Sequence, residues 1–381
     1  MRTTATAVFF SASALLIYIL AGYPLLLGWM ARRFGKAIQK QDQLRTVSIL
    51  IAVHNGASFL AAKLDSVLNL RYPSELTEIL VLSDGSTDDT EQIARRYEQR
   101  GVRLLSLPRR GKAAAINEGV ARSGGEILVL TDVRQELEPE SVSRLVACFA
   151  DPAVGAVSGA LHIRRGSRME ERSVSLYWRY ERWIRTQLSR LDSIFGATGA
   201  LYAIRRELTA PMPEDTLVDD MHLPLAAFFR GYRLILEETA RAIDYPARVK
   251  TEFSRKVRTL AGNFQLLRRY PELLSFRNRM LFHFLSYKFA RLALPYLVIL
   301  LLASSLGLPA PWAAVTVGAQ ALFYALAVID VLISETAAIK RLTSPARAFV
   351  VMMAAAVCAL AVFCFRPQQS WRPTEMQGPG Y

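Results

Sequence analysis

Several polar residues in the first half of the chain closely follow short apolar runs. They comprise two carboxylates, an ammonium group, an imidazole and an amide: His54, Asn55, Asp84, Lys112 and Asp132. Carboxylate and ammonium groups gathered at one place can bind a charged ligand, and carboxylate oxygens can also bind a divalent cation. A single acid after an apolar run often caps a helix instead. Two such acids, Asp84 and Asp132, after successive runs favour a ligand site.

The apolar runs predict the elements that position these residues. They have the length and the β-branched and leucine content of buried strands: Val47–Val53, Glu78–Ser83, Val102–Pro108 and Glu126–Thr131. Between the first two, Phe59–Leu70 carries apolar residues at helical spacing. Buried strands that alternate with helices predict a parallel sheet covered on both faces, which binds ligands at the carboxyl ends of its strands. The polar residues would therefore meet at that end.

Two later motifs add small residues and further acids. GATGALYAIRREL (Gly196–Leu208) has glycine and alanine where the backbone would approach a bulky ligand or would pack in a tight turn. Its candidate site residues are Gly196, Gly199 and Tyr202. LVDDMHLPL (Leu217–Leu225) places Asp219 and Asp220 at the start of an apolar helix, where capping would account for one of them.

Composition indicates that another part of the chain lies in a membrane. The 381 residues carry 47 Lys and Arg against 33 Asp and Glu, a net charge of +14, yet 52% are hydrophobic. Such a chain is too apolar to be disordered. Buried core helices or membrane spans would explain the long apolar segments, which can cross a hydrocarbon core of about 30 Å. These segments are Ala7–Met30, about Phe284–Leu306, Trp312–Ile333 and Ala346–Phe365.

Positive charges beside the apolar segments predict the topology. Arg32, Arg33 and Lys36 follow the first segment, and Lys340, Arg341 and Arg347 lie between the last two. Because such charges stay on the cytoplasmic side, we expect an uncleaved anchor with its N-terminus outside and a cytoplasmic catalytic domain. The expected organisation is an anchor (1–36), a catalytic α/β domain (46–250), an amphipathic interfacial segment (251–280), three membrane helices (284–365) and a tail (366–381).

From about Val47 to Phe264 the motifs, in their order, resemble those of membrane-bound family 2 glycosyltransferases. The flanking apolar segments resemble those of the family's polysaccharide synthases, such as hyaluronan, chitin and cellulose synthases. This resemblance implies a GT-A nucleotide-sugar-binding domain with a mixed, mainly parallel sheet, plus about four transmembrane helices. It also implies that the strand end Ala52–Asn55, with His54, and Asp84 hold the nucleotide base and ribose. Lys112 would lie near the base or the diphosphate.

The resemblance places Asp132 at the first acid of the family's metal-binding D-x-D motif. A departing nucleoside diphosphate gains negative charge and needs a cation, either a metal ion or fixed basic groups. Mg²⁺ or Mn²⁺ would suit a carboxylate ligand. The third position of the motif is Arg134, which cannot bind a cation. Either Asp132 holds the metal together with diphosphate oxygens and water, with Gln135 able to lend an oxygen, or Arg134 partly substitutes for it.

Other roles follow from the same resemblance. Asp220 would be the general base that deprotonates the acceptor hydroxyl, with Asp219 as its orienting or acceptor-contacting neighbour. The Gly196–Leu208 stretch would lie near the acceptor and the donor sugar. The basic stretch Glu252–Tyr270 occupies the place of the family's Q-x-x-R-W motif, with Arg255, Arg258 and Thr259 at the three defined positions. Arg258 would then clamp the diphosphate, while the tryptophan that processive synthases use is missing.

The sequence thus indicates an inner-membrane inverting glycosyltransferase. It would transfer a hexose or N-acetylhexosamine from a UDP-linked donor to a lipid-linked or growing saccharide in surface polysaccharide or glycolipid synthesis. Two alternatives are a processive synthase that extrudes its own polymer and a non-catalytic nucleotide-sugar-binding subunit of an export complex. Expected partners are membrane lipids and export or assembly proteins, but not nucleic acid. The stretch YWRYERWIR (Tyr177–Arg185) stays open between stacking on sugars or lipid headgroups and packing behind the sheet.

Overall fold

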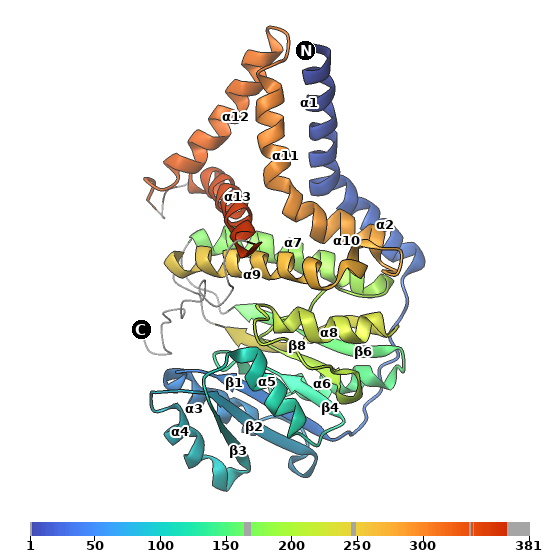
Figure 1. Cartoon of the computed structure of the whole chain (residues 1–381), viewed down its shortest axis with the longest axis vertical. Helices are drawn as coiled ribbons and strands as arrows, with labels where there is room; N and C mark the ends of the chain where they lie inside the picture. Colours follow the sequence, from blue (N-terminus) through green and yellow to red (C-terminus); the bar gives the residue numbers. More distant parts are fainter. Residues whose placement is uncertain (1, 164–168, 245–248, 335–336, 338, 364–381) are drawn as a thin grey trace. The chain divides into compact units, whose positions relative to one another are not determined.

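The computed structural model describes residues 2–163, 169–244, 249–334, 337 and 339–363 (Figure 1). The chain divides into two compact units. A helical unit contains Met1–Phe34, Arg165–Gln187 and Val249–Trp371. A sheet unit contains Gly35–Arg164 and Leu188–Arg248. The predicted tail, 366–381, lies outside the described residues.

The sheet unit begins with four parallel strands. They are β1 (Val47–Val53), β2 (Thr77–Asp84), β3 (Val102–Leu107) and β4 (Ile127–Leu130), and they pair in the order β3-β2-β1-β4. These strands agree with the predicted runs to within one residue at each end. β1, β2 and β4 are buried almost throughout, which explains their agreement, since strands covered on both faces are largely apolar. The edge strand β3 is buried at only two of its six positions.

The sheet continues with antiparallel pairs. β7 (Tyr202–Arg205) pairs antiparallel with β4 and with β6 (Val154–Ile163), and β6 runs parallel to β8 (Arg233–Asp244). The short β5 (Glu136–Leu137) closes the far edge against β8. Within the described residues this is an eight-stranded sheet of order β3-β2-β1-β4-β7-β6-β8-β5. The predicted mixed, mainly parallel sheet is therefore confirmed.

Helices cover both faces of this sheet (Figure 1). On one face, Leu60 and Leu64 of α3 (Ala57–Leu68) share a buried core with Ile49 and Ile51 of β1. This face is also covered by α4 (Thr90–Arg96) and α6 (Ser141–Ala147). The other face packs against α5 (Lys112–Ala121) and α8 (Asp219–Phe229). There α5 lies so close to β2 that a Cβ at Gly119 would be 2.5 Å from a methyl group of Leu82.

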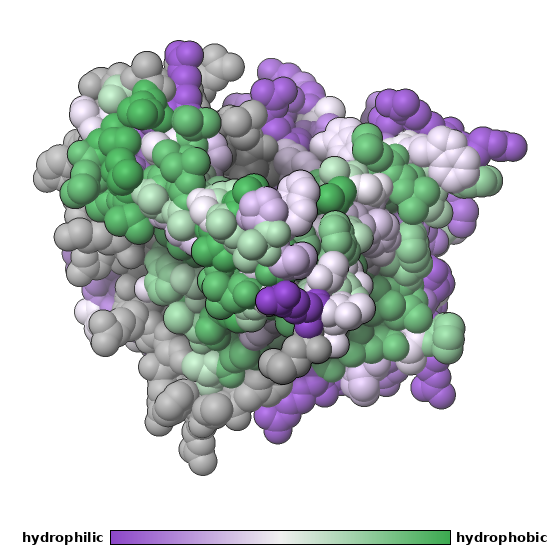
Figure 2. All heavy atoms as spheres, turned by 90° about the horizontal axis from the view of Figure 1, so that it is seen from above, coloured by the Kyte–Doolittle hydropathy of each residue, from purple (hydrophilic) through white to green (hydrophobic). Residues whose placement is uncertain are grey.

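The helical unit holds the long apolar helices. Within the described residues, four are long and apolar enough to cross a membrane: Arg2–Phe34, Leu281–Ser305, Trp312–Ile329 and Lys340–Ala359. The first comprises α1 (Arg2–Ile17) and α2 (Tyr23–Phe34), and the second contains α10 (Leu281–Phe284) and α11 (Ala290–Ser305). The others are α12 (Trp312–Ile329) and α13 (Lys340–Ala359). Hydrophobic residues cover much of the face shown in Figure 2, as expected for helices that meet lipid.

Two further helices of this unit are amphipathic in sequence. α9 (Val249–Arg269) matches the predicted basic segment and packs against α13. α7 (Met169–Leu191) contains the aromatic and arginine-rich stretch, and its residues up to Gln187 belong to the helical unit. The choice between stacking on sugars or lipid headgroups and packing behind the sheet stays open for this stretch.

The contacts of α7 explain why it joins the helical unit. Glu181 accepts a hydrogen bond from the Tyr287 hydroxyl and pairs with Arg291, whose guanidinium lies 4.4 Å from the centre of the Tyr287 ring. Burial favours the neutral acid, but Arg291 outweighs it and lowers the pKa of Glu181 to about 2. The Trp183 ring fills the space beside Gly28 of α2, where a Cβ would lie 3.1 Å away. These contacts pack the described part of the aromatic and arginine-rich stretch against other helices of the helical unit.

Candidate functional site

The loops after β1 and β2 are joined to each other by polar contacts. Nδ1–H of His54 donates to the carbonyl oxygen of Asp84 at 2.9 Å. The Asn55 amide oxygen accepts the Thr87 N–H at 2.8 Å, and Asn55 adopts a left-handed φ of 51°, which asparagine tolerates. Ala52 lies half-buried in β1, two residues before His54, and pairs with Leu82 of β2. Three of the residues predicted to bind the nucleotide, His54, Asn55 and Asp84, are thus neighbours.

Asp84 organises the loop that leads into α5. Its carboxylate, 2% exposed, accepts the N–H of Arg110 at 2.8 Å and of Gly111 at 3.0 Å, and it pairs with the Arg109 guanidinium. Gly111 has a φ of 101°, a conformation that a side chain would strain. The loop therefore has a fixed path, and its fixed end sets the position of Lys112, the first residue of α5.

Lys112 lies between carboxylates from two other elements. Its Nζ is 2.7 Å from Oδ1 of Asp132, which follows β4, and 3.0 Å from Oδ1 of Asp219, which begins α8. The Asp219 side chain is 11% exposed, whereas those of Asp132 and Lys112 are 38% and 41% exposed. Residues from three separate elements thus form one charged group at the strand ends.

Asp220 joins this group through the backbone of Gly199. The N–H of Gly199 donates to Oδ2 of Asp220 at 2.9 Å, and its carbonyl oxygen accepts the Asp132 N–H at 3.1 Å. A Cβ at Gly199 would lie 3.2 Å from Oδ2 of Asp132 and 3.6 Å from Oδ2 of Asp220. A side chain at this position would therefore press on the Asp132 carboxylate. We call Asp132, Asp219, Asp220 and Lys112 the carboxylate cluster.

Gly196 has a different reason to be glycine. A Cβ there would meet Cγ of Met221 at 2.5 Å, so the residue serves tight packing at the start of α8. Tyr202, in the same motif, is fully buried on β7, and its hydroxyl has no hydrogen-bond partner among the described residues. Burial and the carboxylates of the cluster raise its pKa well above the ordinary value, so the phenol stays protonated.

The cluster shifts the pKa of its own members. Burial and the neighbouring Asp219 raise the pKa of Asp220 to about 6, although Lys112 opposes them. For Lys112, burial works against the charged form, but Asp132 and Asp219 outweigh it and raise the pKa. At neutral pH the Lys112 ammonium is therefore charged and Asp220 is ionised in most molecules. The pKa of Asp220 is close to neutral pH, as that of a general base should be.

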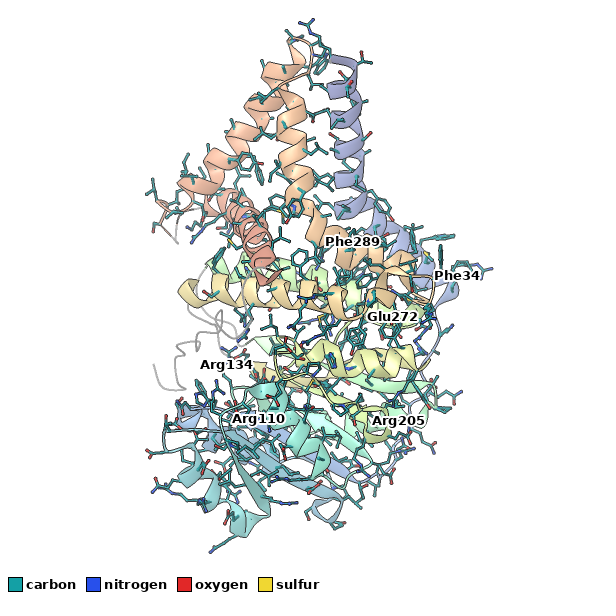
Figure 3. The ribbon with its side chains drawn as sticks, viewed as in Figure 1. Phe34, Arg110, Arg134, Arg205, Glu272 and Phe289 are labelled. Atoms are coloured by element: carbon teal, nitrogen blue, oxygen red, sulfur yellow. The ribbon has the colours of Figure 1, made fainter. Side chains whose placement is uncertain are left out.

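Arg134 does not face the same group as Asp132. The guanidinium of Arg134, which is labelled in Figure 3, pairs with the buried Asp244 of β8, and Nε2 of Gln135 donates to that carboxylate at 3.0 Å. Among the described residues Asp132 pairs with Lys112, and the alternative in which Arg134 partly substitutes for a metal stays a prediction.

The residues of the cluster fit a divalent cation only in part. Asp132 offers carboxylate oxygens of the kind that Mg²⁺ and Mn²⁺ bind, and its side chain is partly exposed. In the described part of the chain, no three His, Cys, Asp or Glu side chains are arranged to hold a metal ion. A cation would therefore bind Asp132 and take its other ligands from elsewhere, such as a diphosphate and water.

Sequence reasoning missed Lys63. It is 1% exposed, and its Nζ donates to the Thr131 hydroxyl and to the Gln135 carbonyl, both at 2.6 Å. Burial lowers its pKa to about 7, while Asp132 and Glu136 oppose that shift. The signal was present, because Lys63 stands on the apolar face of its helix, one turn after Phe59 and one residue before Leu64.

Arg255 and Arg258 lie on α9 and belong to the helical unit. Their predicted contact with a diphosphate therefore remains a prediction.

Sequence reasoning also missed Arg109 and Asp244. Each forms an ion pair with a residue distant in sequence, Asp84 and Arg134 respectively.

Comparison with known proteins identifies the family. Residues 48–210 match the family "Glycosyl transferase family 2", and residues 130–329, more than half of the chain, match "Glycosyl transferase family group 2". The chain belongs to the family 2 glycosyltransferases, as its motifs predicted. The structure has the GT-A fold that the same motifs predicted.

Curated relatives match part of their length. "Probable glycosyltransferase YdaM" of Bacillus subtilis is 24% identical over 53% of this chain and 51% of the relative. A poly-beta-1,6-N-acetyl-D-glucosamine synthase of Staphylococcus epidermidis is 30% identical over 34% of this chain and 31% of its own. A beta-monoglucosyldiacylglycerol synthase of Nostoc is 27% identical over 57% and 46%. The chain therefore spans about a third to a half of these relatives.

A solved structure shares the fold along nearly the whole chain. A mannosyltransferase from Pyrobaculum calidifontis, in complex with GDP-Man and Mn²⁺, is 23% identical with a TM-score of 0.70. The match covers 94% of this chain and 99% of that one. The likeness supports the fold of both units.

Substitution of Gly199 by alanine tests the packing of the cluster. The new methyl group would press on the Asp132 carboxylate, which must shift by a few tenths of an ångström. We expect the transfer rate to fall roughly tenfold, because small misplacements of reacting groups are costly. The measurement is nucleotide release from the donor that the unmodified chain uses fastest. Gly124→Ala is the matched control, since nothing lies within 4 Å of its Cβ, and an equal loss in both variants would contradict the argument.

Proposed function

We propose that the chain is a membrane-bound inverting glycosyltransferase. It would move a hexose or N-acetylhexosamine from a UDP-linked donor to a lipid-linked or growing saccharide. The observation that carries this proposal is the Asp220 carboxylate, which the Gly199 N–H holds beside the Lys112–Asp132 pair at the strand ends. The names of the relatives, a polysaccharide synthase and a glycolipid synthase, support surface polysaccharide or glycolipid as the product class.

Asp220 would act as the general base. In its ionised form it takes the proton from the acceptor hydroxyl as the oxygen attacks the anomeric carbon. The bond from that carbon to the diphosphate oxygen breaks on the opposite side, so the configuration inverts. The hydrogen bond from Gly199 N–H fixes Oδ2 of Asp220 and leaves its other oxygen to accept the proton. Asp219 would orient this group through Lys112.

The departing diphosphate would meet positive charge from several sources. Lys112 is the nearest protein cation to Asp132 at 2.7 Å, and Arg258 and Arg255 of α9 would contact the diphosphate as well. A divalent cation bound through Asp132 would neutralise charge on the diphosphate oxygens. Ala52, His54, Asn55 and Asp84 would hold the base and ribose. Gly199 and Tyr202, with Gly196 behind them, would lie toward the acceptor.

We place the chain in the inner (plasma) membrane as a multi-pass protein with a cytoplasmic catalytic domain. The support is the set of four apolar helices and the basic residues Arg32, Arg33 and Lys340 at their ends. The basic face of α9 would bind anionic lipid at the surface. The residue bounds given above for the anchor, the catalytic domain, the interfacial segment and the membrane helices are part of this proposal.

Processive synthesis is the second candidate. The similarity to a poly-beta-1,6-N-acetyl-D-glucosamine synthase favours it, although Thr259 stands where processive synthases carry a tryptophan. The length of the product made by the purified chain separates a single transfer from polymerisation. A non-catalytic subunit of an export complex would bind a nucleotide sugar without releasing nucleotide.

A panel of donors tests the proposed activity. Membranes that contain the full chain are supplied with acceptor lipids and with UDP- or GDP-linked sugars, with Mg²⁺ or Mn²⁺ or with EDTA. We expect the chain to release nucleotide from a UDP-sugar. We also expect EDTA to lower the rate of this release. No release from any donor would contradict the enzyme, and release unaffected by EDTA would contradict the cation at Asp132.

Asp220→Asn tests the base. The amide keeps the shape but cannot take a proton, so we expect transfer to fall by about 10²- to 10⁴-fold with nucleotide binding retained. Binding is measured by calorimetry with UDP, and transfer by nucleotide release. Asp89→Asn is the control, because Asp89 is exposed and its side chain forms no capping bond. Transfer by Asp220→Asn at the control rate would overturn the assignment.

The pH dependence of transfer tests the same group. Because Asp220 must be ionised to accept a proton and its pKa is about 6, the rate should rise tenfold per pH unit below 6 and level off above it. Lys112→Met removes a charge that lowers this pKa, so the rising limb should move to higher pH. A limb that stays in place in Lys112→Met, or a rate independent of pH from 5 to 7, would count against Asp220.

A further inference from the structure

We propose that Lys63 is a positioning residue for sugar transfer, which holds the turn that carries Asp132 in its working geometry. The proposal rests on the proposed roles of Asp132 and Asp220. Lys63 itself contacts neither the donor nor the acceptor in this assignment, and it acts through Thr131 and Gln135.

The two acceptors of Lys63 flank one turn of the chain. Thr131 stands immediately before Asp132, and Gln135 stands three residues after it. Nζ of Lys63 reaches both at 2.6 Å, so a single ammonium group closes the turn from the side of α3. Asp244 holds the C-terminal half of the same turn, because it pairs with Arg134 and accepts a hydrogen bond from the Gln135 amide. The turn therefore has supports on α3 and on β8.

The support extends from Lys63 to the proposed base. The Thr131 hydroxyl gives its hydrogen to the Ala200 carbonyl at 2.6 Å, so its lone pair is available to the Lys63 ammonium. The next residue back, Gly199, binds Oδ2 of Asp220 through its N–H and accepts the Asp132 N–H. Lys63, Thr131 and the Gly199–Ala200 backbone thus form one hydrogen-bonded path to both carboxylates.

Stability gives no reason for a lysine at this position. Lys63 is 1% exposed among apolar residues of α3, and a buried ammonium loses its hydration. Replacement of buried charged groups by apolar side chains of similar volume is often neutral or stabilising. Methionine would fill the same space without donating a hydrogen bond. The hydrogen bonds from Lys63 to the turn, rather than its packing in the core, explain why this position holds a charged residue.

Lys63→Met in the full-length chain tests the proposal. We expect kcat to fall by about 10- to 100-fold, as for a misplaced catalytic group, with little change in the thermal unfolding temperature. Amide hydrogen exchange of the segment 131–135 should become faster, while exchange of β1 and β2 stays the same. A purely structural role would speed exchange throughout the sheet. Asp65→Asn, on the exposed side of the same helix, is the control that should change neither kcat nor exchange.

A double-mutant cycle checks the path. Thr131→Val removes the hydroxyl that links Lys63 to Ala200, so the loss in kcat for Lys63→Met with Thr131→Val should be smaller than the product of the single losses. If Lys63→Met does not fold, Thr131→Val and Lys63→Arg carry the test, with partial rescue of kcat expected in Lys63→Arg. Lys63→Met with unchanged kcat and unchanged exchange would overturn the proposal. An unmodified chain that transfers no sugar would instead overturn the proposed function. In that case the exchange measurement would still show whether Lys63 stabilises the turn 131–135.

Discussion

The Lys112 ammonium between Asp132 and Asp219 is the interaction on which the candidate site depends. Carboxylates from the end of β4 and the start of α8 would repel one another without a cation between them, and Asp220 adds a further negative charge. Lys112 compensates this charge only because the Asp84 loop fixes the start of α5. The residual repulsion and burial raise the pKa of Asp220 to about 6, which suits a base at neutral pH.

The geometry of the sheet makes this meeting of charges possible. The parallel half brings the ends of β1, β2 and β4 to one place, and antiparallel β7 brings the Gly199 backbone against the end of β4. A parallel sheet alone would supply Asp84 and Asp132 but not the backbone that holds Asp220. The change of strand direction at β7 therefore brings the proposed base next to the ends of the parallel strands.

The helical unit uses charge for a different purpose. Glu181, Arg291 and Tyr287 connect α7 to the helix that begins the second apolar span. A carboxylate and a guanidinium that satisfy each other can lie among apolar helices, where an isolated charge would be costly. Arg347 and Lys340 likewise surround the buried Asp330 between α12 and α13. The basic excess of the chain is thus partly structural in this unit.

The sequence by itself determined the first four strands, the long apolar helices and the family, because burial on both faces of a sheet and long apolar segments leave local patterns of residue type. It did not predict β5, β6, β7 or β8. It also found Asp132, Asp219, Asp220 and Lys112 as candidates, since each follows a strand or begins a helix. Only the tertiary structure decided which of them touch. It also turned Arg134 toward Asp244, Lys63 toward Thr131, and α7 toward the helical unit. These outcomes depend on contacts between segments far apart in the chain, and no local pattern encodes the partner of a buried charge.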